Sequence, residues 1–588
     1  MSEERVSGSA IEDFDRLQSM GWSAGASHIK LAAMEALAEL APPEPVASVS
    51  YVSHGRVLIV GPRDAALAAT DRLKTDLDVH VLVAGEAGNA AAGGYLIWNG
   101  QVESIKGYLG AFEVSWRDAR YAQEQPLALA SADDDVVVSA AKGICTGHFD
   151  LVLDFSATPL FDMPAPPQGY FAASGKADLD PVYAELTQMV GEFEKPKFFA
   201  YKEKICAHSR SQKQGCNRCI EICSTRAIRS DGNHVKVDPH LCMGCGACAT
   251  VCPSGAMSYQ YPRVADRGMQ FKALLGAYRQ AGGAHACVLI HNATDGRDLL
   301  AHAAATGAGL PERVLPLEAW HIASIGVDLL LGAVCLGASN VVLLSSGSET
   351  REYRDALRSE MRLAETILNA LGYAGTHFAL IEANNADALA DALARVQPAT
   401  LAAMPATFNL GNDKRTTLEF AIEYLVKHAP APKQEIALEA GAPYGAVKVD
   451  SAKCTLCMAC TGACPESALM DSADYPRLKF VERNCVQCGL CETTCPENAI
   501  TLQPRLLLTP QWKQEVVLNE AEPFDCISCG KPLGTKQMID SMLGKLAGHS
   551  MFQGEGKLKR LQMCADCRIV DMMNNKNEAS ILTGERRA

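Results

Sequence analysis

Eight cysteines between residues 454 and 495 constrain this chain more than any other feature of its sequence. They form two groups with the spacing Cys-x2-Cys-x2-Cys-x3-Cys-Pro, and twenty residues lie between the last cysteine of the first group, Cys464, and the first of the second, Cys485. Three thiolates at this spacing can hold one face of an iron–sulfur cube, whereas the fourth lies too far along to join them and reaches a neighbouring cube. Buried free cysteines that act only as small apolar residues have no reason to repeat at fixed offsets. The spacing therefore predicts two [4Fe-4S] clusters, one held by Cys454, Cys457, Cys460 and Cys495, and the other by Cys485, Cys488, Cys491 and Cys464.

A second set of eight cysteines, between residues 206 and 252, has nearly the same pattern. Its second half is regular, but nine residues separate Cys206 from Cys216, and Ser224 stands where the regular motif has proline. The interval between the halves is close to that of the regular set, so we expect the same two-cluster fold. The predicted ligands are Cys206, Cys216, Cys219 and Cys252 for one [4Fe-4S] cluster, and Cys242, Cys245, Cys248 and Cys223 for the other. A free thiol at Cys206, with another ligand in its place, is the alternative.

The remaining cysteines divide into a paired motif and three single residues. Cys526 and Cys529 form one Cys-x2-Cys pair, and Cys564 and Cys567 form another. Four thiolates without a carboxylate favour a closed tetrahedral site that holds one structural zinc ion. A rubredoxin-like iron or an unmetallated pair is the alternative. The single residues are expected to be buried packing residues, although two of them, Cys287 and Cys335, leave metal ligation open; the third is Cys145.

Length and charge limit the class of protein. A chain of 588 residues implies several domains, because single cores stop growing near about 250–300 residues. The formal net charge of −14 argues against nucleic acid and suits docking onto a basic patch of a redox partner. The N-terminus lacks a signal pattern and the cysteines have metal-ligand spacings, so a cytoplasmic location is expected. The apolar run 326–344 contains Asp328 and breaks at Gly337, which predicts a buried helix and strand and no transmembrane segment.

The motifs divide the chain into six expected parts within a multidomain α/β plus α+β fold. These are an N-terminal helical segment (1–50), a Rossmann-like α/β domain (51–190), a first cluster unit (195–262, unit 1), a small parallel α/β domain (263–440), a second cluster unit (441–508, unit 2) and a C-terminal zinc domain (515–588). The Rossmann-like expectation rests on a strand at 56–61, a helix at 65–73 and a strand at 79–83. The turn between them lacks the second and third glycines of a dinucleotide site, so we expect no bound nucleotide, and a flavin remains the alternative.

Alternating strands and helices in residues 263–440 predict the small parallel sheet. We expect strands at 286–290, 340–344 and 376–381, and helices at 322–336, 352–371 and 387–396. Three histidines in this domain, His285, His291 and His321, lack a carboxylate or cysteine at ligand spacing and are expected to be ordinary residues of the fold. Lys414 and Arg415, just before a helix expected at 417–427, either lie near the clusters or form a solvated charge pair.

Residues 206–252 and 454–495 resemble bacterial two-cluster ferredoxins, which implies low-potential one-electron transfer. The whole-chain order is similar to large ferredoxin-type proteins linked to molybdenum- or tungsten-dependent formate dehydrogenases and heterodisulfide-reductase-like systems, as suggested by 206–210, 454–460 and 526–532. The middle domain is similar to the delta subunit of methyl-viologen-reducing hydrogenases, which binds a two-iron cluster through its own cysteines. Serines follow Leu344 here, so we do not expect that extra cluster.

These observations together predict an intracellular electron-transfer subunit that carries four [4Fe-4S] clusters. The expected partner is a redox protein, such as the catalytic subunit of a formate-dehydrogenase-like or heterodisulfide-reductase-like complex, and the chain itself need not do bond chemistry. One alternative is an oxidoreductase with its own flavin in residues 51–190. Another is an accessory factor that matures a molybdenum-dependent formate dehydrogenase. The stretched loop after Cys206 leads us to expect that unit 1 faces something specific.

Overall fold

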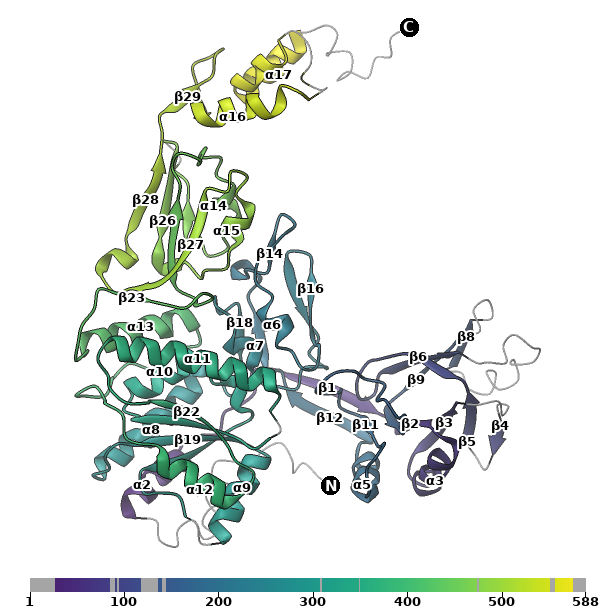
Figure 1. The fold of residues 1–588 in the computed structure, drawn as a ribbon. Helices are drawn as coiled ribbons and strands as arrows, with labels where there is room; N and C mark the ends of the chain where they lie inside the picture. The colour runs from purple at the N-terminus through teal and green to yellow at the C-terminus, as the bar shows by residue number, and fades with distance from the viewer. Residues whose placement is uncertain are drawn as a thin grey trace.

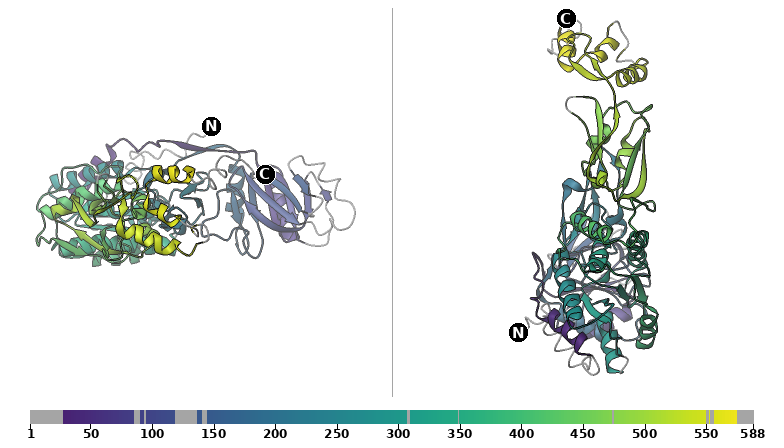
Figure 2. Two further views of the ribbon diagram at one scale, coloured as in Figure 1. Left: turned by 90° about the horizontal axis from the view of Figure 1, so that it is seen from above. Right: turned by 90° about the vertical axis from the view of Figure 1, so that its left-hand side faces the viewer.

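The computed structural model describes residues 27–84, 90–92, 95–117, 136–139, 144–306, 309–347, 349–472, 475–549, 552 and 556–574. Figure 1 shows a central α/β domain with the N-terminal domain to one side, and with unit 2 and the C-terminal domain stacked above it. The view from above in Figure 2 shows the same separation of the N-terminal domain from the rest. Among the described residues, no helix is both long enough and apolar enough to cross a membrane.

The N-terminal domain is built on a mixed sheet with the strand order β11-β10-β2-β3-β5-β4, parallel except for β4. A second, antiparallel sheet with the order β6-β7-β9-β8 covers one face, and two helices cover the other. The mixed sheet comprises β2 (Arg56–Gly61), β3 (Asp78–Val83), β4 (Ala90–Ala92), β5 (Tyr95–Asn99), β10 (Leu151–Asp154) and β11 (Tyr170–Ala172). The second sheet comprises β6 (Gln101–Lys106), β7 (Phe112–Arg117), β8 (Val136–Ser139) and β9 (Ile144–Phe149), and the helices are α3 (Arg63–Leu73) and α5 (Asp180–Gln188).

The predicted parallel β-α-β start is therefore present, but the antiparallel layer was not expected. Four consecutive buried residues in β2 fit a parallel strand that is covered on both faces. Trp98 and Trp116 are almost fully buried between the sheets, with ring centroids 5.6 Å apart. A Cβ at Gly61, where φ is +141°, would lie 2.6 Å from the Cβ of Phe155, so this glycine allows the ends of β2 and β10 to pack closely.

The N-terminal helix joins the central domain rather than standing apart. Helix α2 (His28–Ala38) packs against α8 (Val264–Gln280), and its Ala33 is fully buried in the central core. The Lys30 ammonium donates hydrogen bonds to the carbonyls of Leu310 and Pro311, each at 3.1 Å. The chain then runs outward as β1 (Ser48–Ser53) and returns as β12 (Gly191–Pro196), which pairs with β1 in antiparallel fashion.

The central domain is a parallel sheet with the order β20-β19-β21-β22. Its strands are β19 (Cys287–Asn292), β20 (Val314–Ala319), β21 (Asn340–Ser345) and β22 (Phe378–Glu382). One face packs against α8 (Val264–Gln280), α10 (Val327–Cys335), α11 (Arg351–Ala370) and α13 (Lys414–Lys427). The other packs against α9 (Asp295–Ala305) and α12 (Ala386–Arg395).

Two features of this domain differ from the sequence expectation. The helix expected over 322–336 is divided into a 3₁₀ turn, η2 (Ile322–Ser324), and α10, because Gly326 between them is extended, with φ −91° and ψ 178°. Strand β20 was not expected, and it contains Pro316, which is tolerated because β20 is an edge strand. The apolar run 326–344 forms α10 and β21, both fully buried. Cys287 and Cys335 are fully buried in this core.

The two cluster units consist of short strands and helices around their cysteine loops. Unit 1 contains β13 (Phe199–Tyr201), η1 (Glu203–Ile205), β14 (Ser209–Arg210), β15 (Lys213–Gln214), α6 (Arg218–Glu221), β16 (Ile228–Asp231), β17 (His234–Val237), α7 (Ala247–Thr250) and β18 (Met257–Tyr259). Unit 2 contains β23 (Glu435–Ala437), β24 (Gly445–Val449), α14 (Ala459–Ala463), β25 (Leu469–Met470), β26 (Arg477–Val481), η3 (Glu482–Asn484), α15 (Leu490–Thr494) and β27 (Ile500–Leu507). In each unit the strands pair in antiparallel fashion.

The C-terminal part follows unit 2 without a long linker. After η4 (Pro510–Lys513), strand β28 (Glu515–Glu520) pairs with β26, so residues 515–520 belong to the sheet of unit 2. The small terminal domain then comprises β29 (Pro523–Asp525), β30 (Pro532–Thr535), α16 (Lys536–Leu546), η6 (Leu558–Gln562) and α17 (Ala565–Asn574). Hydrogen bonds connect it to unit 2, among them those from Thr535 Oγ1 to the Thr455 carbonyl (3.0 Å) and from Gln537 Nε2 to the Ala452 carbonyl (2.7 Å).

Candidate functional site

The cysteine loops turn through residues with left-handed backbone conformations. In the second loop of unit 1, Gly244 and Gly246 have φ of +77° and +79°, and a Cβ at Gly246 would lie 2.5 Å from the Cβ of Ser324 in the central domain. Gly489 takes this conformation in unit 2, but in the other half of that unit Met458 takes it, with φ +59°. Such a conformation is costly for residues other than glycine and persists where the surrounding structure holds it. The repeated turns direct successive cysteines of one loop toward a common space.

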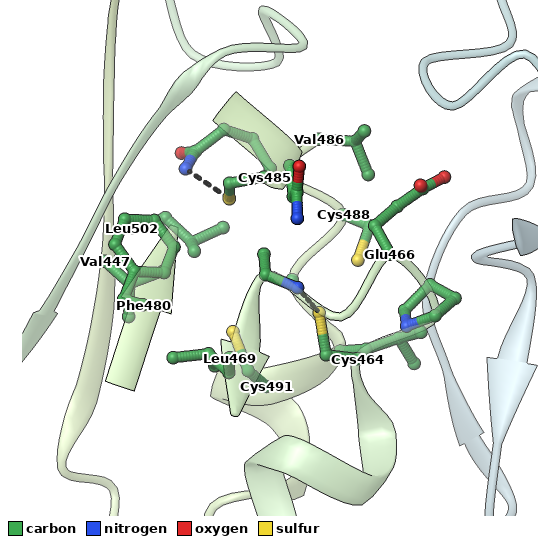
Figure 3. A pocket seen from close by; sticks show the side chains of 16 residues that line it. Val447, Cys464, Glu466, Leu469, Phe480, Cys485, Val486, Cys488, Cys491 and Leu502 are labelled. Carbon is green, nitrogen blue, oxygen red and sulfur yellow. Dashed lines mark hydrogen bonds between the residues drawn. The ribbon is translucent and has the colours of Figure 1, made fainter. Parts of the chain in front are cut away.

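In unit 2 the eight cysteines line two separate cavities. Figure 3 shows one of them, with four sulfur atoms around a common centre, those of Cys464, Cys485, Cys488 and Cys491. The four cysteines of the other cavity are Cys454, Cys457, Cys460 and Cys495. The last cysteine of each motif therefore lines the cavity formed by the other motif. Apolar side chains such as Leu469 and Phe480 complete the walls of the first cavity.

The donor groups around these thiols suit a metal–sulfur cluster. Main-chain N–H groups of Ala468 and Ala499 donate to the Sγ atoms of Cys464 and Cys495, at 3.2 and 3.3 Å. Burial, followed by the nearby thiols of Cys454 and Cys457, raises the pKa of Cys460 to about 12. Four thiolates cannot remain deprotonated so close together without positive charge between them. The thiol sets, their N–H donors and the apolar walls thus fit [4Fe-4S] clusters, whose potentials depend on these features.

Unit 1 brings its cysteines together in the same two sets. Burial raises the pKa of Cys219, and the next largest causes are the nearby thiols of Cys252, Cys216 and Cys206. Burial also raises the pKa of Cys248, followed by the thiols of Cys245, Cys242 and Cys223. The N–H of Met257 donates to the Sγ of Cys252 at 3.4 Å. Cys206 is buried within this group despite its unusual spacing.

The stretched loop of unit 1 folds into a hairpin that reaches unit 2. Its strands β14 and β15 pair through Ser209–Gln214 and Arg210–Lys213. At its base, Ala207 forms a buried apolar cluster with Ala463 and Leu490 of unit 2, and a Cβ at Gly215 would lie 2.8 Å from the Cγ of Leu490. Cys216 and Cys488 both pack against this cluster. The specific neighbour of the stretched loop is therefore the second unit.

Two adjacent cations at the start of α13 connect both units to the central domain. Lys414 Nζ donates to three carbonyls of unit 1, those of Thr250 (2.6 Å), Ala249 (3.0 Å) and Cys252 (3.1 Å). Arg415 donates to carbonyls beside or within unit 2, those of Arg483 (2.7 Å), Pro443 (2.8 Å) and Cys485 (3.4 Å). Of the two sequence alternatives, the position near the clusters is therefore correct.

Sequence reasoning missed the residues that join unit 1 to the central domain. The hydroxyl groups of Ser224 and Tyr353 are hydrogen-bonded, and Tyr353 also interacts with the thiol of Cys245. The signal was the replacement of the usual proline by Ser224. The histidines flagged in the central domain have local roles: His321 Nδ1 accepts from the Ala323 N–H at 3.0 Å, and His291 is buried.

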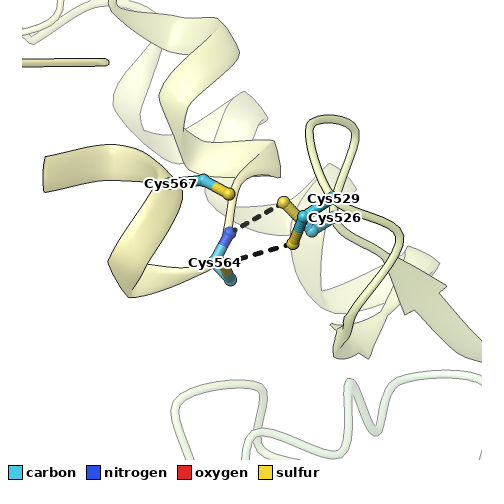
Figure 4. Close-up of side chains that lie close together, drawn as sticks. All are labelled: Cys526, Cys529, Cys564 and Cys567. Carbon is cyan, nitrogen blue, oxygen red and sulfur yellow. Dashed lines mark hydrogen bonds between the residues drawn. The ribbon is translucent and has the colours of Figure 1, made fainter. Parts of the chain in front are cut away.

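The last four cysteines form a compact site. Their Sγ atoms all lie within 4.8 Å of one another, and Figure 4 shows that they face a common centre from the turn after β29 and the start of α17. The Cys564 N–H donates to Cys526 Sγ at 3.2 Å. Burial acts to raise the pKa of Cys526, but main-chain N–H groups, that of Cys564 first, outweigh it and lower the pKa to about 6. A set of four thiols at this spacing could bind one metal ion.

Comparison with known proteins supports the iron–sulfur chemistry. The 4Fe-4S dicluster domain family matches residues 214–256 and 453–500. The chain is 34% identical over 53 residues to hydrogenase-4 component A of Escherichia coli (strain K12), which covers 9% of this chain and 26% of that protein. It is 36% identical over 42 residues to a 7Fe ferredoxin of Hydrogenibacillus schlegelii, covering 7% of this chain and 54% of the ferredoxin.

A ferredoxin of Alicyclobacillus acidocaldarius subsp. acidocaldarius is 38% identical over 53 residues, which is 9% of this chain and 67% of the ferredoxin. The chain thus spans about a quarter of the hydrogenase component and about half of the 7Fe ferredoxin. The matched segments carry the cysteine motifs of electron-transfer iron–sulfur proteins. Through its two dicluster domains, the chain belongs to the 4Fe-4S ferredoxins.

Proposed function

We propose that this protein is an intracellular relay that passes single electrons through four [4Fe-4S] clusters arranged in one line. In unit 1 the proposed ligand sets are Cys206, Cys216, Cys219 and Cys252, and Cys242, Cys245, Cys248 and Cys223. In unit 2 they are Cys454, Cys457, Cys460 and Cys495, and Cys485, Cys488, Cys491 and Cys464. The clusters supply the one-electron redox capacity, and the chain fixes and shields them.

The observation that carries this proposal is the contact between the two units. Ala207, Ala463 and Leu490 form one buried cluster, and Cys216 of unit 1 and Cys488 of unit 2 both pack against it. The thiol of Cys216 is close enough to contribute to the raised pKa of Cys488. We call the sites that contain Cys216 and Cys488 the inner sites of unit 1 and unit 2, and the other site of each unit its outer site. The contact makes the two inner sites nearest neighbours, which supports a continuous path for electrons.

The ends of the proposed path meet different parts of the molecule. At one end, the Cys245 loop contacts the central domain through Tyr353 and Ser324. At the other end, the Cys454 site lies beneath the C-terminal domain, whose Lys545 pairs with Glu497 in the cavity wall at 2.6 Å. We infer that the C-terminal domain holds one structural zinc ion, since its four thiols can supply all four ligands of a tetrahedral site. A rubredoxin-like iron is the alternative.

The proposed partners are redox proteins that exchange electrons at these two ends. The resemblance of the motif order to formate-dehydrogenase-associated proteins favours a formate-dehydrogenase-like catalytic subunit. The similarity to hydrogenase-4 component A favours membership of a multi-subunit redox complex in the same way.

Metal analysis and spectroscopy of anaerobically purified protein test this function. We expect about 16 Fe, 16 sulfide and one Zn per chain from the ligand count. Low-temperature EPR of the fully reduced protein should show broadened signals from magnetically interacting clusters. A content near eight iron atoms per chain, or four isolated signals without interaction, would refute the continuous relay. As a control, the Cys145→Ser variant should retain the full iron content, because Cys145 is buried in the N-terminal domain.

A further inference from the structure

Three of the four proposed cluster sites have a positively charged side chain bonded to the carbonyl of a ligand cysteine. Lys195 Nζ donates to the carbonyls of Cys242 and His240, both at 2.7 Å. Lys414 Nζ donates to the Cys252 carbonyl at 3.1 Å. Arg415 Nη2 donates to the Cys485 carbonyl at 3.4 Å. These cations serve the two sites of unit 1 and the inner site of unit 2.

The outer site of unit 2 has a neutral donor in the corresponding position. The Asn519 amide donates to the Cys454 carbonyl at 3.3 Å. Cys242, Cys485 and Cys454 are each the first cysteine of a half-motif, so the comparison is between equivalent carbonyls. Lys453, next to Cys454, is largely exposed and pairs with Asp450 at 3.4 Å, so solvent and this carboxylate screen its charge.

Acidic side chains do not distinguish the two sites of unit 2. Glu466 lines the cavity of the inner site and Glu497 lines that of the outer site, each two residues after the last cysteine of a motif. Glu497 also pairs with Lys545 of the C-terminal domain at 2.6 Å, so that these two charges offset each other. At the carbonyl of the first cysteine, the sites differ in having Arg415 at the inner site and Asn519 at the outer site. A cluster gains negative charge when it is reduced, so a nearby cation stabilises the reduced form and raises the reduction potential, whereas a neutral amide does so less.

We propose that Lys195, Lys414 and Arg415 raise the reduction potentials of their three clusters above that of the cluster held by Cys454, Cys457, Cys460 and Cys495. This inference rests on the proposed relay and adds a direction to it. A one-electron donor on the C-terminal side would reduce the Cys454 site. That site would be reoxidised as the electron passes to the Cys464 site, and the electron would continue through the two sites of unit 1 to a one-electron acceptor that docks on the side of the central domain.

Redox titrations of single variants, followed by EPR, test the proposal. In Lys195→Met, Lys414→Met and Arg415→Gln we expect one midpoint potential to fall in each case. The expected shift is about a tenfold change in the reduction equilibrium constant, which is 59 mV for one electron. Lys427→Met is the matched control, because Lys427 lies exposed at the other end of the same helix, α13. Its potentials should equal those of the unmodified protein.

If one of these variants loses its cluster, the introduction of a cation at the site that lacks one provides an independent test. Asn519 is half-exposed, so Asn519→Lys should fold, and we expect it to raise the lowest of the four potentials and leave the other three unchanged. Unchanged potentials in all variants with full iron content would overturn the proposal and leave the relay intact. A movement of any component other than the lowest in Asn519→Lys would also overturn it. An iron content below four clusters in the unmodified protein would instead refute the relay itself.

Discussion

Leu490 offers the most direct test of the contact between the two cluster units. Its side chain is fully buried, and its neighbours Ala207 and Ala463 are small. Leu490→Ala removes apolar groups worth about 0.8 kcal/mol for each buried CH₂ and leaves a cavity. Alanine neighbours and a glycine at position 215 have no side chains long enough to fill that space. We therefore expect a cost in the upper part of the usual range, about 3–5 kcal/mol.

Hydrogen exchange followed by mass spectrometry can measure the loss of stability locally, in the segments that form the contact between the two units. In Leu490→Ala we expect faster exchange in the β14–β15 hairpin and in α15, because both lose their packing partner, with the iron content unchanged. The magnetic interaction between clusters in EPR should weaken in the same variant. Leu73→Ala is the matched control, since Leu73 is equally buried but lies in the N-terminal domain. Hairpin exchange that stays unchanged in Leu490→Ala, or that rises equally in Leu73→Ala, would refute the contact.

Three further predictions concern the ligand sets, the terminal metal and a buried lysine. Cys495→Ser should remove the same EPR component as Cys457→Ser, because both thiols line one cavity; loss of the component removed by Cys488→Ser would contradict the exchanged ligands. Cys526→Ser should release the metal and speed exchange in α16 and α17 with about 16 Fe retained, whereas Ser528→Ala should do neither. Burial lowers the pKa of Lys30 from 10.5 to about 8, so between pH 8 and 10.5 the unfolded chain binds more protons than the folded chain. The free energy of unfolding should therefore rise with pH over this range, by at most about 3 kcal/mol. Exchange of α2, corrected for intrinsic rates, should show this gain, and Lys30→Met should abolish it.

Local sequence patterns predicted the parts of the fold that depend on near neighbours. The cysteine spacing predicted which thiols lie together, because the ligands that one loop supplies must lie within a few residues of one another. The same holds for β2, β19 and β21, whose continuous apolar runs indicate buried parallel strands. The thiols that line each cavity of unit 2 are grouped as these local signals indicate, and their role as ligands stays a prediction.

Features that depend on distant partners could not be predicted in this way. The contact of α2 with α8 joins residues more than 200 positions apart, and the sequence of α2 does not indicate which helix it packs against. Lys195 and Asn519 lie outside the cysteine motifs, and their hydrogen bonds to Cys242 and Cys454 exist only in the folded chain. Strand β20 contains Pro316, and a proline argues against a central strand. Only the fold shows that β20 lies at the edge of the sheet, where a proline is tolerated.

The two cluster units share a fold but differ in how they are attached, and this difference gives the proposed relay its two distinct ends. Unit 1 replaces the usual proline with Ser224, which bonds to Tyr353 of the central domain, and extends a hairpin onto unit 2. Unit 2 keeps its regular loops and meets the C-terminal domain through Thr455. A symmetric pair of units would offer equal ends to any partner. Here one end is bound to an α/β domain and the other to a four-cysteine domain, so partners at the two ends must recognise different surfaces.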